Sequence, residues 1–145
     1  MSKHPHHELA EAWFRRAWTE LDPAAVDEIF DAEGVVEGLG ETIHGPDAFR
    51  AFQAQMLELV QDVEVDVLEH FHDDAGGNMV LCALRAVSRR TQRPVAMTGS
   101  VRYRVRDGKV KEVRDHWDWM SFWEQLELLP QGSFLAALSG ARVGQ

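Results

Sequence analysis

The sequence has only one cysteine and one tyrosine in 145 residues, and it contains no apolar run as long as a membrane span. The single cysteine, Cys82, cannot form an internal disulfide, which agrees with a reducing compartment. A spanning helix needs about 20 consecutive apolar residues. The first residues, MSKHPHHELAEAW, also lack the apolar core of a signal peptide. We therefore expect a cytoplasmic protein without a membrane partner.

Positive charge is also scarce, because 15 Lys and Arg residues stand against 24 Asp and Glu residues, giving a formal net charge of −9. Domains that neutralise phosphates are typically basic, so nucleic acid is not an expected partner. A chain of 145 residues suits one domain with a sizeable core. We expect a single domain over residues 1–145, with flexible ends at 1–6 and 140–145.

The first part of the chain has the hydrophobic pattern of helices. Apolar residues recur every four positions from Leu9 to Leu21, and Asp22 followed by Pro23 predicts the N-cap and the first-turn proline of a second, short helix. The glycines of VVEGLGE, at 35–41, indicate a weak strand with a bend or a close backbone approach. The phrase HGPDAF, at 44–49, predicts the start of a third helix.

After residue 60 the hydrophobic period changes to that of strands. Valines alternate with acidic residues over 63–67, a further strand is expected at about 95–105, and Asp107-Gly108 predicts a tight hairpin into the last strand. Helices followed by antiparallel strands indicate an α+β fold. We expect a curved, mostly antiparallel sheet to wrap around the N-terminal helices and to enclose a cone-shaped cavity.

The last hairpin decides which side chains face that cavity. Before the turn, Val101 and Tyr103 alternate with arginines, so the valine and tyrosine face is expected to be buried. After the turn, Val110 and Val113 are three positions apart instead of two. A β-bulge at Lys111-Glu112, which inserts one extra residue, would restore the period of the strand.

The bulge would place Asp115 on the buried face, between Val113 and Trp117. Loss of water disfavours the charged form of a carboxyl group and raises its pKa toward the range useful for proton transfer. Without the bulge the assignment reverses, and His116 and Asp118 become the inward pair.

With this order of elements, the chain resembles the SnoaL-like polyketide cyclases of the nuclear-transport-factor-like superfamily, which also includes limonene epoxide hydrolase and ketosteroid isomerase. The resemblance rests on IHGPDAF at 43–49 and on the stretch from Gly108-Lys109-Val110 through Arg114-Asp115 to Gln125-Leu126. It covers nearly the whole chain. It implies the SnoaL-like cone fold, a pocket for a hydrophobic small molecule, and a homodimer formed through the outer face of the sheet.

Asp115 matches the acidic residue that acts as acid and base in the cyclases, and also one of the catalytic acids of the epoxide hydrolase. The chain departs from both families at other positions. Where the cyclases carry histidines this sequence has Val113 and Val101, and Arg85-Ala86-Val87 lacks the second acid of the Arg-x-Asp in the epoxide hydrolase. Neither named reaction is therefore carried over.

Three residues are candidates for catalysis. Asp115 would be the general acid/base, Arg85 would orient or stabilise an oxyanion, and Tyr103 would donate its hydroxyl. The structural alternatives are a buried hydrogen-bonded acid, a solvated or paired strand arginine, and a packed tyrosine. The residues expected to bind substrate as the lining of the pocket, or else to form the core, are Trp13, Phe30, Phe52, Met56, Met97, Val101, Val113 and Trp117.

No metal and no organic cofactor is expected. His70 and His72 lie at strand spacing, but the sequence offers them no third inward ligand. The predicted function is acid/base chemistry of the cyclase, isomerase or hydrolase type, in which Asp115 acts on a hydrophobic, oxygenated small molecule. The alternatives are a ligand-binding protein without chemistry, and a dimeric interaction module whose pocket is filled by its own side chains.

Overall fold

The computed structural model describes residues 3–144. Its N-terminal helical part comprises α1 (Pro5–Trp13), the π-helical turn η1 (Phe14–Thr19) and α2 (Ala25–Ile29). The strands β1 (Phe30–Leu39) and β2 (Glu41–His44) precede α3 (Gly45–Leu59). The long strands β3 (Val60–His72), β4 (Gly77–Ser88), β5 (Pro94–Arg106) and β6 (Lys109–Trp117) follow, and the chain ends with α4 (Trp119–Gln125) and α5 (Ser133–Leu138).

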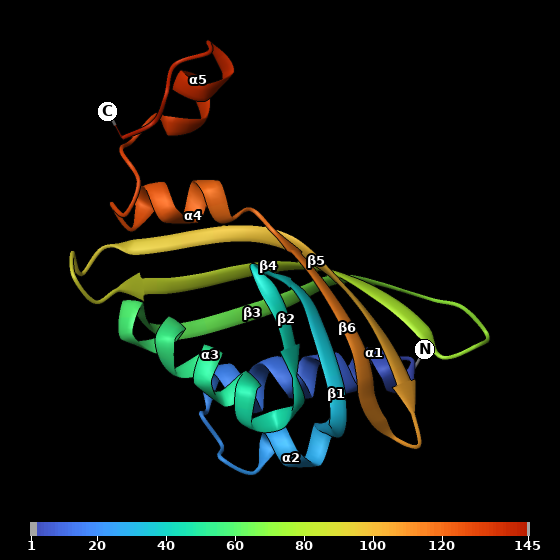
Figure 1. Cartoon of the computed structure of the whole chain (residues 1–145). Coiled ribbons are helices and arrows are strands. Elements are labelled where there is room, and N and C mark those ends of the chain that lie inside the picture. The colour runs from blue at the N-terminus through green and yellow to red at the C-terminus, as the bar shows by residue number, and fades with distance from the viewer. Residues whose placement is uncertain (1–2, 145) are drawn as a thin grey trace.

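The six strands form one curved sheet in the order β2-β1-β6-β5-β4-β3. Only the β1–β6 pair is parallel, and every other neighbouring pair of strands in this sheet is antiparallel. Figure 1 shows α1, α2 and α3 on one side of the sheet, which we call its inner face, whereas α5 extends beyond α4, away from the strands. The expected α+β fold, with a mostly antiparallel curved sheet around N-terminal helices, is confirmed.

The expected flexibility of the two chain ends, at 1–6 and 140–145, stays a prediction. Pro5 and His6 are helical, and the Tyr103 hydroxyl donates a hydrogen bond to the His6 carbonyl oxygen at 2.6 Å. Residues 1–2 and 145, which belong to the segments expected to be flexible, lie outside the described residues.

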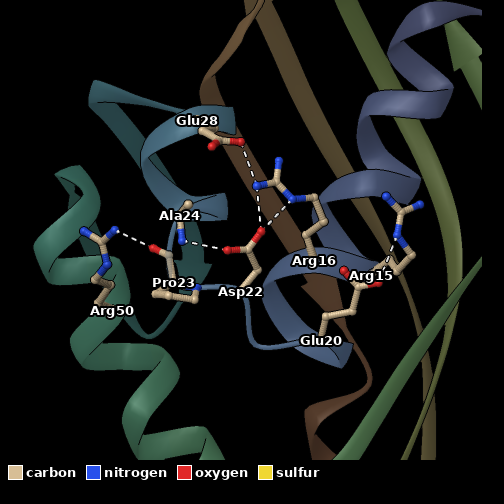
Figure 2. A network of polar contacts seen from close by, with 8 residues as sticks. All are labelled: Arg15, Arg16, Glu20, Asp22, Pro23, Ala24, Glu28 and Arg50. Carbon is tan, nitrogen blue, oxygen red and sulfur yellow. Dashed lines mark hydrogen bonds and ion pairs between the residues drawn. The ribbon is translucent and has the colours of Figure 1, made fainter.

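A cluster of charged side chains fixes the corner between η1 and α2 (Figure 2). The Arg16 guanidinium donates to one carboxylate oxygen of Asp22 through Nε at 2.9 Å and Nη2 at 2.7 Å, and it lies 2.6 Å from the Glu28 carboxylate. The other Asp22 oxygen accepts from the backbone N–H of Ala24 at 3.0 Å. Asp22 was expected to cap α2 itself. It instead fixes the turn before the helix, and hydrogen bonds from Arg16 lower the pKa of its carboxyl.

The expected bulge is present in β6. Arg104 of β5 pairs with Glu112 of β6, but the next β5 residue, Val105, pairs with Val110, so Lys111 is the extra residue. One additional residue in a strand reverses the face of everything beyond it. The bulge prediction is therefore confirmed.

Beyond the bulge, β6 directs alternate side chains to the inner face as predicted. Val113 lies opposite Tyr103, and Asp115 lies opposite Val101. His116 and Asp118 are exposed, so the alternative that placed this pair inward is wrong.

The core lies between the inner face and the helices, and it is continuous with α4. Phe122 of α4 is fully buried and packs with residues of α3 and the ends of β3, β4 and β5. In the part of the chain that the structure describes, none of the helices combines the length and the apolarity needed to cross a bilayer.

Candidate active site

A cavity lies between the inner face of the sheet and the helices. Its empty volume is about 1000 Å³ when the part open to solvent is included, and the centre of a water-sized sphere can occupy about 100 Å³. Apolar and aromatic side chains from α1, η1, α3, α4 and the strands form its wall. Of the described residues that line it, Asp115 is the only one with a charged side chain.

Asp115 sits deep in the fold but keeps some accessible surface, because it lines the cavity. Burial raises the pKa of its carboxyl from an ordinary value of 3.8 to about 6, and a hydrogen bond from Trp117 opposes this rise. The carboxyl group is therefore mostly ionised at pH 7 but is close enough to neutrality to gain and lose a proton there.

Two neighbours of Asp115 fix its position. The Trp117 indole Nε1 donates to Asp115 Oδ1 at 2.9 Å, and no other side-chain hydrogen bond to this carboxyl occurs among residues 3–144. On the other side, Gly38 has φ +95°, and a Cβ atom there would lie 2.0 Å from the Asp115 carbonyl oxygen. Only glycine fits at this approach of β1 to β6. The close backbone approach predicted for VVEGLGE is confirmed.

Tyr103 also lines the cavity, but its hydroxyl is engaged elsewhere. The Oη atom donates to the His6 carbonyl oxygen at 2.6 Å and so ties β5 to the start of α1. Burial raises the pKa of the phenol well above its ordinary value. This hydrogen bond is what the packing alternative leads one to expect, and donation from Tyr103 to a substrate stays a prediction.

Arg85 does not join the cavity. Its neighbour Leu84 lines the wall, so Arg85 points to the outer face, where its guanidinium lies 2.8 Å from Glu64 and 3.5 Å from Asp66. The side chain is exposed. This position separates Arg85 from Asp115 by the thickness of the sheet, and the structure therefore gives it no direct part in the chemistry of the cavity.

The structure brings the other sequence-predicted residues together around the cavity. Each of the residues expected to bind substrate lines it: Trp13, Phe30, Phe52, Met56, Met97, Val101, Val113 and Trp117. Whether they bind a substrate stays a prediction.

Sequence reasoning missed several lining residues, among them Trp18 and Phe49. Trp18 follows Trp13 by five positions, which does not fit the period of an α-helix. The π-helical turn η1 brings both indoles to the same side, where Trp13 and Phe49 have ring centroids 5.1 Å apart and Trp18 and Phe49 have centroids 6.1 Å apart. Phe49 lies four positions after Gly45 in α3, and the helical period alone could have placed it there.

The histidines form a separate cluster at the start of α1. The His4 ring stacks on His72 with centroids 4.1 Å apart, and the Asn78 Oδ1 atom lies 2.9 Å from His70 Nε2 and 3.2 Å from His6 Nδ1. Burial, with a smaller effect of neighbouring imidazoles, lowers the pKa of His4 and His70. Within residues 3–144, no group of three or more His, Cys, Asp or Glu side chains is arranged to hold a metal ion.

A family model described as the SnoaL-like domain matches residues 10–113. The chain belongs to the SnoaL-like domain family. The matched stretch runs from the second half of α1 to the middle of β6 and ends two positions before Asp115, so the family match itself carries no information on that residue. No curated protein matches the chain.

Several solved structures share the fold at low sequence identity. A hypothetical protein with a ketosteroid isomerase-like fold from Catenulispora acidiphila DSM 44928, in complex with trimethylamine, is 20% identical with a TM-score of 0.74 over 86% of this chain and 95% of that chain. A candidate SnoaL-like polyketide cyclase from Jannaschia sp. CCS1 is 17% identical with a TM-score of 0.76, over 90% and 99% of the two chains. TerC, co-crystallised with polyporic acid, is 18% identical with a TM-score of 0.74, over 86% and 99%. At these identities the likeness establishes the fold alone.

Proposed function

We propose that this SnoaL-like protein is a small-molecule enzyme that uses Asp115 as a general acid/base on a hydrophobic, oxygenated substrate, without a cofactor. The observation that carries the proposal is the single carboxyl group in an otherwise apolar cavity, with a pKa of about 6. Such a group accepts a proton as an ionised base at pH 7, and its conjugate acid returns the proton readily.

The chemistry that fits this arrangement is proton abstraction from a carbon next to a carbonyl group. Trp117 holds Oδ1 of Asp115, which leaves Oδ2 for the substrate. The ionised carboxylate takes the proton to give an enolate, and the protonated carboxyl group then delivers it to a second position. Isomerisation and ring closure both begin with this step. The aromatic wall would bind the apolar body of the substrate and exclude water.

Two structural neighbours are described in complex with small organic molecules, polyporic acid and trimethylamine. Trimethylamine carries no oxygen atom, so only polyporic acid is of the oxygenated kind proposed here. Polyporic acid combines aromatic surface with oxygen atoms, which are the two features that the aromatic wall and the Asp115 carboxyl would recognise.

Hydrogen–deuterium exchange on simple ketones tests the proposal without knowledge of the natural substrate. A panel of hydrophobic cyclic ketones is incubated with the protein in D₂O, and loss of the proton signals next to the carbonyl is followed by NMR. We expect exchange of at least one ketone to be accelerated, and Asp115→Asn to lower the rate by about 10²–10⁴-fold. The matched control, Glu64→Gln on the outer face, should exchange at the wild-type rate. Equal rates for wild type and Asp115→Asn would refute the role of Asp115.

A non-catalytic ligand-binding protein is the second candidate function, and the geometry around Asp115 supports it. The Tyr103 hydroxyl is engaged by His6, and Arg85 lies on the outer face, so neither supplies a second polar group near the carboxyl. Native mass spectrometry of the purified protein separates the two functions. A retained ligand that stays chemically unchanged on long incubation favours binding alone, whereas its conversion favours the enzyme.

We also propose that the protein is a homodimer that associates through the outer face of the sheet. Apolar side chains on β3 and β4 support this proposal, since Leu68, Phe71 and Met79 are exposed by 60%, 54% and 38%. Sedimentation analysis of wild type and of Phe71→Glu tests it. A dimeric wild type and a monomeric variant are expected, and a monomeric wild type at high micromolar concentration would contradict it.

A further inference from the structure

Gly99 of β5 lies directly opposite Trp117 of β6. A Cβ atom at position 99 would lie 2.5 Å from Cε3 and 2.6 Å from Cδ2 of the Trp117 indole, and 2.7 Å from the His116 carbonyl oxygen of β6. Real Cβ atoms essentially never approach other atoms so closely. The indole therefore lies against the bare backbone of β5, in a space that any other residue at position 99 would fill.

This contact determines where the indole N–H points. Trp117 and Asp115 are two positions apart, so their side chains leave the same face of β6 but start about 7 Å apart along the strand. The indole has to lie in the direction of Asp115 for Nε1 to reach Oδ1 at 2.9 Å. The space at Gly99 allows this orientation, because the six-membered ring rests there while the N–H edge extends to the carboxyl group.

We propose that Gly99 is a positioning residue for Asp115, acting through Trp117. Its missing side chain holds the indole in the one orientation that binds Oδ1 and leaves Oδ2 facing the cavity. The inference rests on the proposed role of Asp115, and it adds that the proton affinity of the carboxyl is regulated by a residue that touches neither the carboxyl side chain nor the ligand.

Loss of the hydrogen bond from Trp117 should change the pKa of Asp115 in a known direction. A hydrogen bond donated to the ionised carboxylate favours the charged form and lowers the pKa, against the effect of burial. A side chain at position 99 would displace the indole and remove this bond. The pKa of Asp115 should then rise, and the carboxylate should become free to rotate.

NMR titration of the protein without ligand tests the inference. The indole ¹H–¹⁵N signal of Trp117, assigned by its loss in Trp117→Phe, should titrate with Asp115 in the wild type, with a midpoint near 6. In Gly99→Ala this signal should move and lose its titration, while the ¹³C carboxyl midpoint of Asp115 rises by about one pH unit. Trp117→Phe, which keeps an aromatic ring without the N–H, should raise the midpoint by a similar amount. The double variant should add nothing further.

Ser100→Ala is the matched control, because Ser100 is the next residue of β5 and lies opposite His116 on the outer face. It should leave the midpoint unchanged. An unchanged midpoint in Gly99→Ala, or equal shifts in Gly99→Ala and Ser100→Ala, would overturn the inference.

A measurement on the wild type covers the case in which Gly99→Ala does not fold. An α proton of Gly99 that lies under the indole should resonate clearly upfield of an ordinary glycine, and Trp117→Phe should reduce this displacement. Ordinary glycine shifts in the wild type would overturn the inference. None of these readouts needs a substrate, so they can succeed or fail independently of the ketone exchange that tests the proposed function.

Discussion

The two faces of the sheet give a carboxyl group opposite surroundings. On the inner face, Asp115 lies among apolar residues, lines a cavity where no other described lining residue is charged, and has a raised pKa. On the outer face, Glu64 is exposed and lies 2.8 Å from the Arg85 guanidinium. The difference shows that the side of the sheet decides whether a carboxylate is a solvated partner in an ion pair or a candidate acid/base.

One backbone feature assigns Asp115 to the inner side. Without the extra residue at Lys111, the alternation of β6 would send Asp115 outward and His116 inward. The candidate site thus depends on a bulge near the hairpin, four residues before the carboxyl that it orients.

The largest expected effect concerns the apolar wall of the inner side. Phe122→Ala should lower the free energy of unfolding by about 3–5 kcal/mol, because the fully buried ring leaves a void that its neighbours cannot fill. Phe134→Ala is the matched control, since that ring is 58% exposed on α5, and it should change the free energy by less than about 0.5 kcal/mol. Urea denaturation measures both values. Similar losses in the two variants would mean that the inner side does not dominate stability.

The second effect concerns the pH dependence of stability. The folded pKa of Asp115 is raised from 3.8 to about 6, so its contribution is most favourable below 3.8 and is lost as the pH rises through 6. The difference in pKa corresponds to at most about 3 kcal/mol. Asp115→Asn, which cannot ionise, should therefore gain stability relative to wild type between pH 4 and pH 7.

Urea denaturation at several pH values measures this gain, and Glu64→Gln on the outer face serves as the control. The control should show no comparable gain, because Glu64 is exposed and paired. If the difference in the free energy of unfolding between wild type and Asp115→Asn does not change with pH, the pKa of Asp115 is not raised by folding.

The smallest effect is expected on the outer face. Arg85→Ala removes an exposed ion pair, so it should cost about 0.2–1 kcal/mol and should leave ketone exchange unchanged. Thermal unfolding and the exchange assay measure the two quantities. A loss of exchange comparable to that of Asp115→Asn would mean that Arg85 takes part in catalysis, and that the outer face is not separate from the site.

The sequence was sufficient for the features that depend on local periodicity. The three-residue spacing of Val110 and Val113 predicted the bulge, and the bulge predicted the inner position of Asp115. The same periodicity, applied to β4, excludes Arg85 from the cavity, because Arg85 alternates with Leu84 of the wall.

The features that sequence reasoning missed depend on contacts between distant segments. The π-helical turn η1 brings Trp18 beside Trp13, and the spacing of these two residues does not match the 3.6-residue period of an α-helix. The space that Gly99 leaves for Trp117 follows from the register of β5 and β6 together with a side-chain orientation. Neither can be derived from the order of residues alone.

The measurement that tests the account most directly is the ¹³C carboxyl titration of Asp115 in the protein without ligand, assigned by comparison with Asp115→Asn. We expect a midpoint near 6. A midpoint close to 4, the value of an aspartate in water, would contradict the claim that burial raises the pKa of this carboxyl group.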